Sequence, residues 1–294
     1  MSKITEQRNP ASKGIDEKSI QGILETINVE DAKITDAIKA QLPQIEEAVD
    51  KIITSLSSGG NIFLVGAGTS GRLCVLEASE IPPTFGLSPD RIKAIIAGGV
   101  EALYTSVEAA EDNRAKAALE IEKNRVTSSD LVIGVTASGS TPFVLEAIRR
   151  AKELGAQTVG LSCNQDALLS KLVDTPIEVV VGPEIVTGST RMKAGTAQKM
   201  VLNMMTTTAM IKRGLVYDGY MVGVQATNRK LKERSKKIVA AITGASLDEA
   251  EKALEVTNWD ARVAILVVLT HNSPEEADIE LKTRTMRQIL SGEE

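Results

Sequence analysis

Histidine and cysteine are nearly absent from this chain of 294 residues, which contains one histidine and two cysteines. A Ser-His-Asp triad or a histidine-based metal site would have to use His271 alone. Two isolated cysteines do not supply a zinc cluster either. Cys74 and Cys163 lie in apolar segments, so we interpret them as reduced core residues of a cytoplasmic protein. Acid–base chemistry would therefore have to come from carboxylates, lysines and hydroxyl groups.

Aromatic residues and long apolar runs are also scarce. Aromatics make up 2% of the chain, which argues against a base-stacking platform. No run of about 20 apolar residues is present, so we expect no membrane span. The net charge is −5 with scattered Lys and Arg, which argues against nucleic acid as a partner. The first ten residues, MSKITEQRNP, lack the apolar segment of a secretory signal, so we expect a cytoplasmic location.

The most informative stretch is NIFLVGAGTSGRLCVLEASE, residues 61–80. An apolar run of strand length, Ile62–Val65, ends in the glycine-rich turn Gly66–Gly71, and a helical stretch follows from Arg72 to Ser79. Glycines allow the backbone to approach a ligand closely. The new helix directs unsatisfied N–H groups and its positive dipole end into the turn. This arrangement is typical of an anion site, most often for phosphate.

The same spacing fits GxGxxG, the dinucleotide fingerprint, which requires an acidic residue at the end of the next strand. The next candidate strand, Ile92–Ala97, ends in two glycines, and Asp90 precedes it at the wrong end of the sheet. The hydroxyls of Thr69 and Ser70 suit a small phosphorylated ligand better than NAD. An ordinary strand-to-helix turn, with glycines that serve only packing, stays open as an alternative.

Strands and helices alternate along the middle of the chain. Five candidate strands lie at 61–66, 92–97, 131–136, 157–161 and 177–181, with helical stretches near 72–79, 100–123, 142–154 and 166–173 and a long helix at 190–212. Continuous apolar strands alternating with helices indicate an α/β fold with a five-stranded parallel sheet covered on both faces.

The two ends of the chain are predicted to be helical. We expect residues 1–15 to be extended, followed by helices over 16–41 and 43–56. Beyond Gly223 we interpret the basic stretch 228–237 as a solvated helix face. A three-helix module should follow, with one helix opened by a capping box at Ser246 and the others over 260–270 and 274–290. These patterns predict an N-terminal part (1–50), a central α/β domain (51–222) and a C-terminal helical region (223–294).

Small hydroxyl residues and glycines follow four of the predicted strands, at the carboxyl ends where parallel sheets bind ligands. These stretches are Gly68–Gly71, Thr136–Pro142, Ser162–Asn164 and Gly182–Glu184 with Thr187–Thr190. Any one of them is explained equally well as a helix cap. Several that converge on one edge point to a phosphate site.

Two pairs of carboxylates are candidates for acid–base work. Glu80 should follow a helix and precede a rigid turn at Pro82-Pro83, and Glu111 lies on a predicted helix. Spacing alone does not separate Glu80 from Glu77, or Glu111 from Glu108. A solvated helix face is the simpler interpretation for any one of the four.

Together these motifs resemble one family, the N-acetylmuramic acid 6-phosphate etherases. The matching stretches are TEQRNP (5–10), GAGTSGR (66–72), ASEIPPTFG (78–86), AGGVEAL (97–103), VEAAEDN (107–113), ASGSTP (137–142) and EIVTGSTRMKAGTAQK (184–199). The resemblance implies the three-layer αβα sugar isomerase (SIS) fold. It also implies a carbon–oxygen lyase that releases D-lactate from N-acetylmuramic acid 6-phosphate in muramic acid catabolism or cell-wall recycling. A cytoplasmic homodimer without metal or redox cofactor is expected on the same ground.

The resemblance also implies site residues. The two catalytic glutamates of the family fall on Glu80 and Glu111, which resolves the ties left by spacing. Candidate substrate-binding residues are Gly68, Thr69, Ser70, Ser138, Gly139, Ser140, Thr141, Glu184, Ser189 and Thr190. Arg191 and Lys193 either add positive charge there or are surface residues.

Two departures from the family pattern are visible: many relatives have Arg or Lys in place of Ser140, and Cys often replaces Ile81.

Two other functions stay open beside the etherase. One is an aldose–ketose isomerase of the same fold. The other is a non-catalytic sugar-phosphate sensor similar to the glucokinase regulatory protein, which carries two sugar-isomerase domains.

Overall fold

The computed structural model describes residues 3–107 and 109–292 and has a parallel β-sheet at its centre. The strands are β1 (Ile62–Gly66), β2 (Ile92–Ile96), β3 (Leu131–Val135), β4 (Gln157–Ser162) and β5 (Thr175–Glu178), in the order β2-β1-β3-β4-β5. Gly66, the last residue of β1, pairs with Ile96 of β2 and Val135 of β3. The strands therefore end level with one another at one carboxyl edge. The predicted five-stranded parallel sheet is confirmed.

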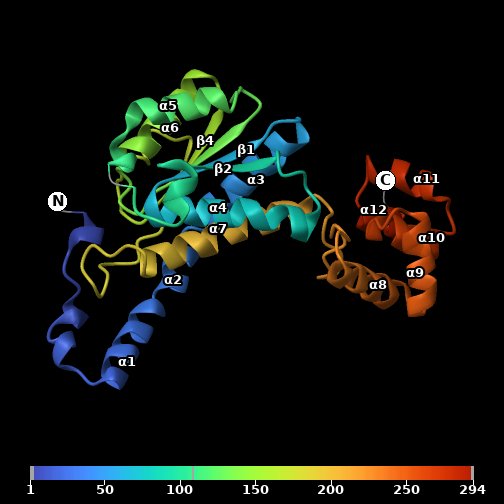
Figure 1. Cartoon of the computed structure of the whole chain (residues 1–294), viewed down its shortest axis with the longest axis horizontal. Coiled ribbons are helices and arrows are strands. Elements are labelled where there is room, and N and C mark those ends of the chain that lie inside the picture. The colour runs from blue at the N-terminus through green and yellow to red at the C-terminus, as the bar shows by residue number, and fades with distance from the viewer. Residues whose placement is uncertain (1–2, 108, 293–294) are drawn as a thin grey trace. The chain divides into compact units, whose positions relative to one another are not determined.

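Helices cover both faces of the sheet (Figure 1). One face carries α5 (Arg114–Lys123) and α6 (Pro142–Glu153). The other carries α3 (Leu42–Ser57) and the first parts of α4 (Gly68–Phe85) and α7 (Lys193–Lys212). Because both faces are covered, β1 and β3 are buried at every position, as the continuous apolar runs predicted.

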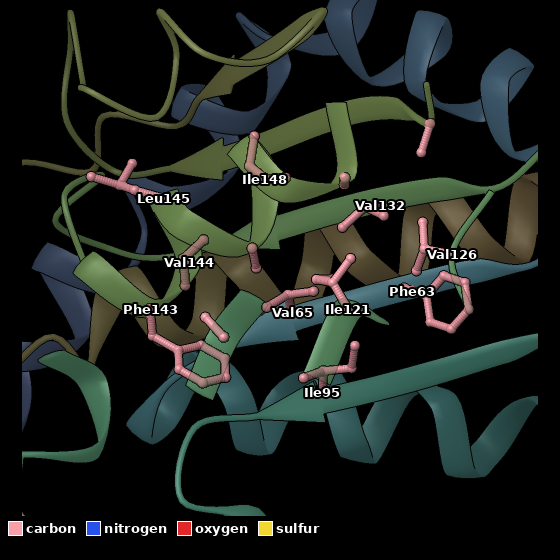
Figure 2. Packing of buried hydrophobic residues seen from close by; sticks show 14 of the residues in the cluster. Phe63, Val65, Ile95, Ile121, Val126, Val132, Phe143, Val144, Leu145 and Ile148 are labelled. Atoms are coloured by element: carbon pink, nitrogen blue, oxygen red, sulfur yellow. The ribbon is translucent and has the colours of Figure 1, made fainter. Parts of the chain in front are cut away.

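The core between the sheet and the α5–α6 layer is built from alternate residues of the strands. Figure 2 shows Phe63 and Val65 of β1 and Val132 of β3 on the same side as Ile121 of α5 and Ile148 of α6. Gly134 of β3 allows α6 to lie close to the sheet. A Cβ atom at Gly134 would lie 2.9 Å from Val144 and 3.0 Å from Ile148.

The N-terminal part differs from the prediction in two ways. Residues 1–15 were predicted to be extended, but short 3-10 helices are present at η1 (Ile4–Glu6), η2 (Pro10–Ser12) and η3 (Ile15–Glu17). Pro10 starts η2 because its fixed φ suits a first helical position, and the Asn9 side chain caps that turn. The predicted helix over 16–41 is two helices, α1 (Ile20–Asp31) and α2 (Ile34–Lys39).

Two predicted helices in the sheet domain are also corrected. The stretch 100–123 forms η4 (Gly99–Leu103), η5 (Ala110–Asp112) and α5, and Ala109, with a positive φ, interrupts it. Residues 166–173 form turns. There the Glu178 carboxylate accepts hydrogen bonds from the N–H groups of Asp166 and Ala167 and from Ser170, which replaces helical pairing.

The chain divides into two compact units, Met1–Ala78 with Asp90–Thr206, and Ser79–Pro89 with Thr207–Glu294. Helices α4 and α7 both begin in the first unit and end in the second. The three parts proposed from the sequence, with limits at 50 and 222, stay a prediction. None of the helices among residues 3–107 and 109–292 is long and apolar enough to cross a membrane.

The second unit contains more helices than predicted. They are α8 (Arg229–Thr243), α9 (Leu247–Val256), α10 (Ala261–Thr270), α11 (Pro274–Leu281) and α12 (Met286–Ser291). The Ser246–Glu249 capping box is confirmed at the start of α9. The predicted helix over 274–290 is wrong because a further capping box, Thr285 with Gln288, starts α12. The basic stretch lies at the start of α8 and is mostly exposed, as predicted. Because 274–290 forms two helices, four helices follow α8 among the described residues, and the predicted three-helix module is wrong.

Candidate active site

The glycine-rich turn follows β1 and leads directly into α4. Gly68, the first residue of α4, has φ +53°, which glycine adopts without strain. Gly71 lets the helix pack closely on the sheet, since a Cβ atom there would lie 2.6 Å from Ile96 Cγ1. Asp90 precedes β2, at the amino edge, as expected. The first turn of α4 therefore directs N–H groups toward the carboxyl edge of the sheet.

This edge contains a topological switch point between β1 and β3. After β1 the chain forms β2, which pairs on one side of β1, and then β3, which pairs on the other side of β1. Open parallel sheets bind ligands at such points. Helix α6 begins after β3 with Thr141 as its N-cap, and within the described residues no side chain caps it. The N-termini of α4 and α6 thus follow the two strands that flank the switch point.

Four hydroxyl groups cluster after β3. Thr136 Oγ1 lies 2.7 Å from Thr141 Oγ1 and 3.3 Å from Ser138 Oγ, which lies 3.2 Å from Ser140 Oγ. The Lys3 ammonium group donates a hydrogen bond to Ser140 Oγ. The sequence reasoning missed Lys3 because it lies 137 residues from Ser140 in the chain. The predicted residues Ser138, Ser140 and Thr141 are brought together, and Lys3 adds a positive charge to them.

The start of α7 packs beside the first turn of α4. Ser70 Oγ donates a 2.9 Å hydrogen bond to Gln198 Oε1, and both side chains are buried. A Cβ atom on Gly195 would lie 3.3 Å from the methyl group of Thr69, so the two helices lie close together. The sequence reasoning named Thr69 and Ser70 but missed Gln198. Its only sequence signal was its place in the GTAQK part of the longest matching motif.

Glu184 and Lys193, both singled out in the sequence, are buried near the start of α7. The two oxygens of Glu184 accept hydrogen bonds from the N–H groups of Lys193 (3.0 Å) and Ala194 (2.9 Å). Its carboxylate therefore caps the helix. Lys193 is 1% exposed and its Nζ lies 2.6 Å from Glu30 Oε2, so the surface interpretation of Lys193 is wrong. Arg191 is exposed. Ser189 and Thr190 lie in the half-buried turns before α7.

The Glu30 carboxylate is the centre of a buried polar network. Burial alone would raise the pKa of Glu30, but hydrogen bonds from Lys193, Lys33 and Asn9 outweigh it and lower the pKa to about 2. The Asn9 amide donates both to Glu30 Oε2 and to the carbonyl of Pro183, each at 2.8 Å. The network therefore connects the N-terminal segment, α1 and the start of α7.

A second contact holds the N-terminal segment at the same edge. Asn164, which follows β4, accepts from the N–H of Thr5 at 3.3 Å and donates to Thr5 Oγ1 and to the Ala137 carbonyl, both at 3.0 Å. With Lys3 on Ser140 and Asn9 on Pro183, residues 3–9 cross the carboxyl ends of β3, β4 and β5. The TEQRNP motif thus belongs to the edge where the hydroxyl groups gather.

The candidate glutamates occupy different environments. Glu80 is exposed and lies inside α4, so the expectation that it follows a helix is wrong, and Pro82 and Pro83 also lie within that helix. Glu80 belongs to the second unit. Glu111 is exposed in η5 of the first unit, two residues after Ala109, which has φ +58°. The catalytic roles of both stay predictions.

Glu77, the competitor of Glu80, is buried and accepts hydrogen bonds from Asn203 and Thr206 of α7. These contacts fit a residue that joins α4 to α7. Glu108, the competitor of Glu111, lies outside the described residues. The structure thus gives Glu77 a structural task and leaves Glu80 accessible.

Comparisons with known proteins connect this arrangement to a family. Residues 44–152 match the N-terminal SIS domain of the glucokinase regulatory protein, and residues 112–208 match the general SIS domain. An N-acetylmuramic acid 6-phosphate etherase of Yersinia pestis is 48% identical over 95% of this chain and 95% of the relative. N-acetylmuramic acid 6-phosphate etherase 1 of Bacillus licheniformis is 46% identical over 93% of this chain and 90% of the relative.

The chain belongs to the N-acetylmuramic acid 6-phosphate etherase family.

Solved structures agree on the fold of this etherase-family chain. A phosphoheptose isomerase of Neisseria gonorrhoeae aligns with a TM-score of 0.50 at 16% identity, over 65% of this chain and 98% of that one. A Bacteroides fragilis protein assigned as a phosphosugar isomerase of capsule formation aligns at 0.51 and 17% identity, over 69% and 97%. At these identities the likeness shows the SIS fold alone, which confirms the predicted fold class.

The two cysteines of this etherase-family chain lie in the core, as the sequence indicated. Cys74 and Cys163 are free and buried. Burial raises the pKa of both thiols, that of Cys163 to about 12, so neither serves as a nucleophile at neutral pH. His271 ends α10 in the second unit. Among the described residues, no three His, Cys, Asp or Glu side chains are grouped as metal ligands.

Proposed function

We propose that this chain cleaves the D-lactyl ether of N-acetylmuramic acid 6-phosphate and yields N-acetylglucosamine 6-phosphate and D-lactate. The observation that carries this proposal is the near-full-length identity of 44–48% to etherases from several bacteria. The activity is that of a carbon–oxygen lyase, and it serves muramic acid catabolism or cell-wall recycling. We also propose a cytoplasmic homodimer, because the family resemblance implies one.

The phosphate group is proposed to bind at the switch point between β1 and β3. The first turns of α4 and α6 offer N–H groups and positive dipole ends, which favour an anion. Ser138, Ser140 and Thr141 line the turn before α6 with hydroxyl groups. Lys3 supplies positive charge at Ser140, where the family resemblance places Arg or Lys in many relatives. Phosphate capture at this edge would orient the sugar for reaction.

The chemistry follows from the open-chain form of the sugar, whose aldehyde at carbon 1 acidifies the hydrogen on carbon 2. A base removes that proton, and the resulting enolate expels lactate by breaking the bond between carbon 3 and the ether oxygen. An acid protonates the departing lactate oxygen. Water then adds to carbon 3 of the unsaturated aldehyde and restores the hydroxyl group. The route needs one base and one acid, which two carboxylates in different protonation states can provide.

We assign the acid role to Glu80 and the base role, together with activation of water, to Glu111. Both side chains are exposed, so each can meet a substrate. Each proton transfer is expected to contribute roughly 100- to 10,000-fold in rate. Glu184 is proposed to act by holding the start of α7, beside the turn that contains Ser189 and Thr190.

A sugar-phosphate sensor is the second candidate, because residues 44–152 match the SIS domain of the glucokinase regulatory protein. An aldose–ketose isomerase would share the enolate chemistry and keep the lactyl group. Release of lactate separates the three functions, since only the etherase produces it.

The first experiment is an assay of D-lactate after incubation with N-acetylmuramic acid 6-phosphate in water labelled with oxygen-18. The elimination route predicts unlabelled lactate and label in the hydroxyl group at carbon 3 of the sugar. Label in the lactate would mean attack on the lactyl carbon and would overturn the roles of Glu80 and Glu111. Tight binding of the sugar phosphate without lactate would favour the sensor.

A further inference from the structure

The side-chain amide of Gln198 is only half satisfied. Gln198 is 1% exposed and lies on α7, and its Oε1 accepts the hydrogen bond from Ser70 Oγ at 2.9 Å. Its Nε2 is buried and has no hydrogen-bond partner among the described residues. Buried N–H groups without a partner are rare because their desolvation is uncompensated. This one lies at the first turn of α4, where phosphate is proposed to bind.

The direction of this hydrogen bond limits what Ser70 can offer a ligand. A serine hydroxyl has one proton to donate, and here Gln198 accepts it. Only the lone pairs of Ser70 Oγ then remain. The oxygens of a phosphate dianion are acceptors, so they need donors. In this arrangement the Ser70 side chain offers a ligand only an acceptor, whereas its position at the start of α4 suits a phosphate group, which needs donors.

We propose that Gln198 is a positioning residue whose side-chain amide flips when a phosphate monoester binds. After the flip, Gln198 Nε2 donates a hydrogen bond to Ser70 Oγ, and the Ser70 hydroxyl donates its proton to a phosphoryl oxygen. This inference rests on the proposed phosphate site. The flip is a rotation of half a turn about the Cγ–Cδ bond of Gln198, and it exchanges the positions of the amide nitrogen and oxygen. These two atoms are nearly equal in size, so the exchange needs no other movement.

Binding of the phosphate monoester favours the flipped amide for two reasons. The atom left without a partner becomes a carbonyl oxygen, and a buried carbonyl lacking a partner is less unusual than a buried N–H. In addition, Ser70 gains a charge-assisted hydrogen bond to the phosphate, which is stronger than its bond to the neutral amide. The close contact of Gly195 with Thr69 keeps α7 against α4 while this happens. Gln198 thereby selects for an anionic group.

The inference is tested by kinetics of D-lactate release with Gln198→Glu, Gln198→Met and Ser70→Ala. A carboxylate at position 198 accepts only, so it keeps the Ser70 proton and also repels phosphate. We expect Gln198→Glu to raise KM about 30-fold or more at pH 8, with kcat changed less than about threefold. This pattern is expected when the lost interaction binds the substrate and the transition state equally. Gln198→Met should raise KM about 3- to 10-fold, since the amide that positions the Ser70 hydroxyl for its hydrogen bond to the phosphate is removed.

The pH dependence distinguishes this role from a merely structural one. A protonated carboxyl group again offers one donor and one acceptor, like the amide it replaces. Position 198 is buried, and burial raises the pKa of a carboxyl group. The ratio of KM for Gln198→Glu to KM for the wild type should therefore fall toward 1 as the pH is lowered from 8 to about 5.5. The matched control is Gln44→Glu on α3, whose amide oxygen is also buried without a partner among the described residues. Its KM should equal that of the wild type throughout.

The outcomes separate this inference from the proposed function. An unchanged KM in both Gln198 variants, with a raised KM in Ser70→Ala, would overturn the inference and leave the etherase and its phosphate site intact. An unchanged KM in Ser70→Ala would overturn the inference and the role of Ser70 in the site. No lactate from the wild type would overturn both proposals. If Gln198→Glu does not fold, Gln198→Met and Ser70→Ala should be non-additive in a double-mutant cycle, and additive effects would contradict the coupling.

Discussion

The two units of this chain bury very different side chains. All the charged side chains that are buried among the described residues belong to the first unit: Glu30, Glu77, Asp130, Glu184 and Lys193. In the second unit the buried polar residues are Ser235 and Thr257, and its core is otherwise apolar. Burying charge is costly unless it is paired. In the first unit these charged groups are paired or hydrogen-bonded, so the fold holds them at defined positions.

The largest expected effects concern the exposed glutamates, which contrast with the buried ones. Glu80→Gln and Glu111→Gln should each lower kcat by about 100- to 10,000-fold, since each removes a proton transfer. Both side chains are exposed, so urea unfolding should give nearly the wild-type midpoint. The matched control is Glu77→Gln, which should lower the midpoint because Glu77 is buried on Asn203 and Thr206. Wild-type kcat in Glu80→Gln would exclude the acid role.

Breaking the buried ion pair tests the cost of charge in the first unit. Lys193→Met removes the fully buried cation that pairs with Glu30 and leaves the carboxylate with Asn9 and with Lys33, whose side chain is exposed, so the free energy of unfolding should fall by up to about 3–5 kcal/mol. Adding Glu30→Leu to Lys193→Met removes the stranded charge, so a large part of the loss should return. Urea unfolding measures both variants. Equal stability of the single and double variants would contradict this account.

Truncation of the apolar core tests the second unit. Leu254→Ala removes a fully buried side chain from α9, and we expect the free energy of unfolding of that unit to fall by about 2–5 kcal/mol. Hydrogen exchange followed by mass spectrometry resolves the two units. Faster exchange should appear in residues 229–291, with little change in the strands. Equal acceleration in the strands would show that the units unfold together.

Acid should weaken the first unit through Glu30. The folded-state pKa of Glu30 is lowered to about 2 from an ordinary value of 4.5. A lowered carboxyl pKa contributes stability that is present above the unfolded value and is lost as the pH falls through the folded one. The contribution should therefore decline between about pH 4.5 and pH 2. Urea unfolding across this range should show a shallower decline in Glu30→Gln than in the wild type.

The smallest expected effect is at Lys3, an exposed cation of the first unit. Lys3→Met should raise KM for the sugar phosphate by about 3- to 10-fold and leave kcat nearly unchanged, because a single charge-assisted hydrogen bond is lost. Added salt should reduce the difference from the wild type, since an exposed charge is screened. Lys13→Met, another exposed N-terminal lysine, is the control. Equal KM values for both variants would remove Lys3 from the site.

Local patterns in the sequence predicted the parts of the molecule that depend on neighbouring residues. The strands were placed within two or three residues of their observed limits, because fully buried strands need continuous apolar runs. The Ser246–Glu249 cap was identified because both of its hydrogen bonds lie within three residues. Helix interruptions were missed at Ala109 and at Thr285, where a single left-handed residue or a second cap outweighs apolar periodicity.

The sequence by itself determined the order of elements, the parallel sheet, the hydroxyl-rich strand ends and the family of this chain. Tertiary structure decided which of the polar residues have partners and which have none. Lys193 is paired with a glutamate 163 residues away, and Ser70 with a glutamine 128 residues away. Local patterns cannot encode such pairs, because the distance between two side chains depends on how the helices pack across the sheet. The burial that makes these pairs strong exists only in the folded chain.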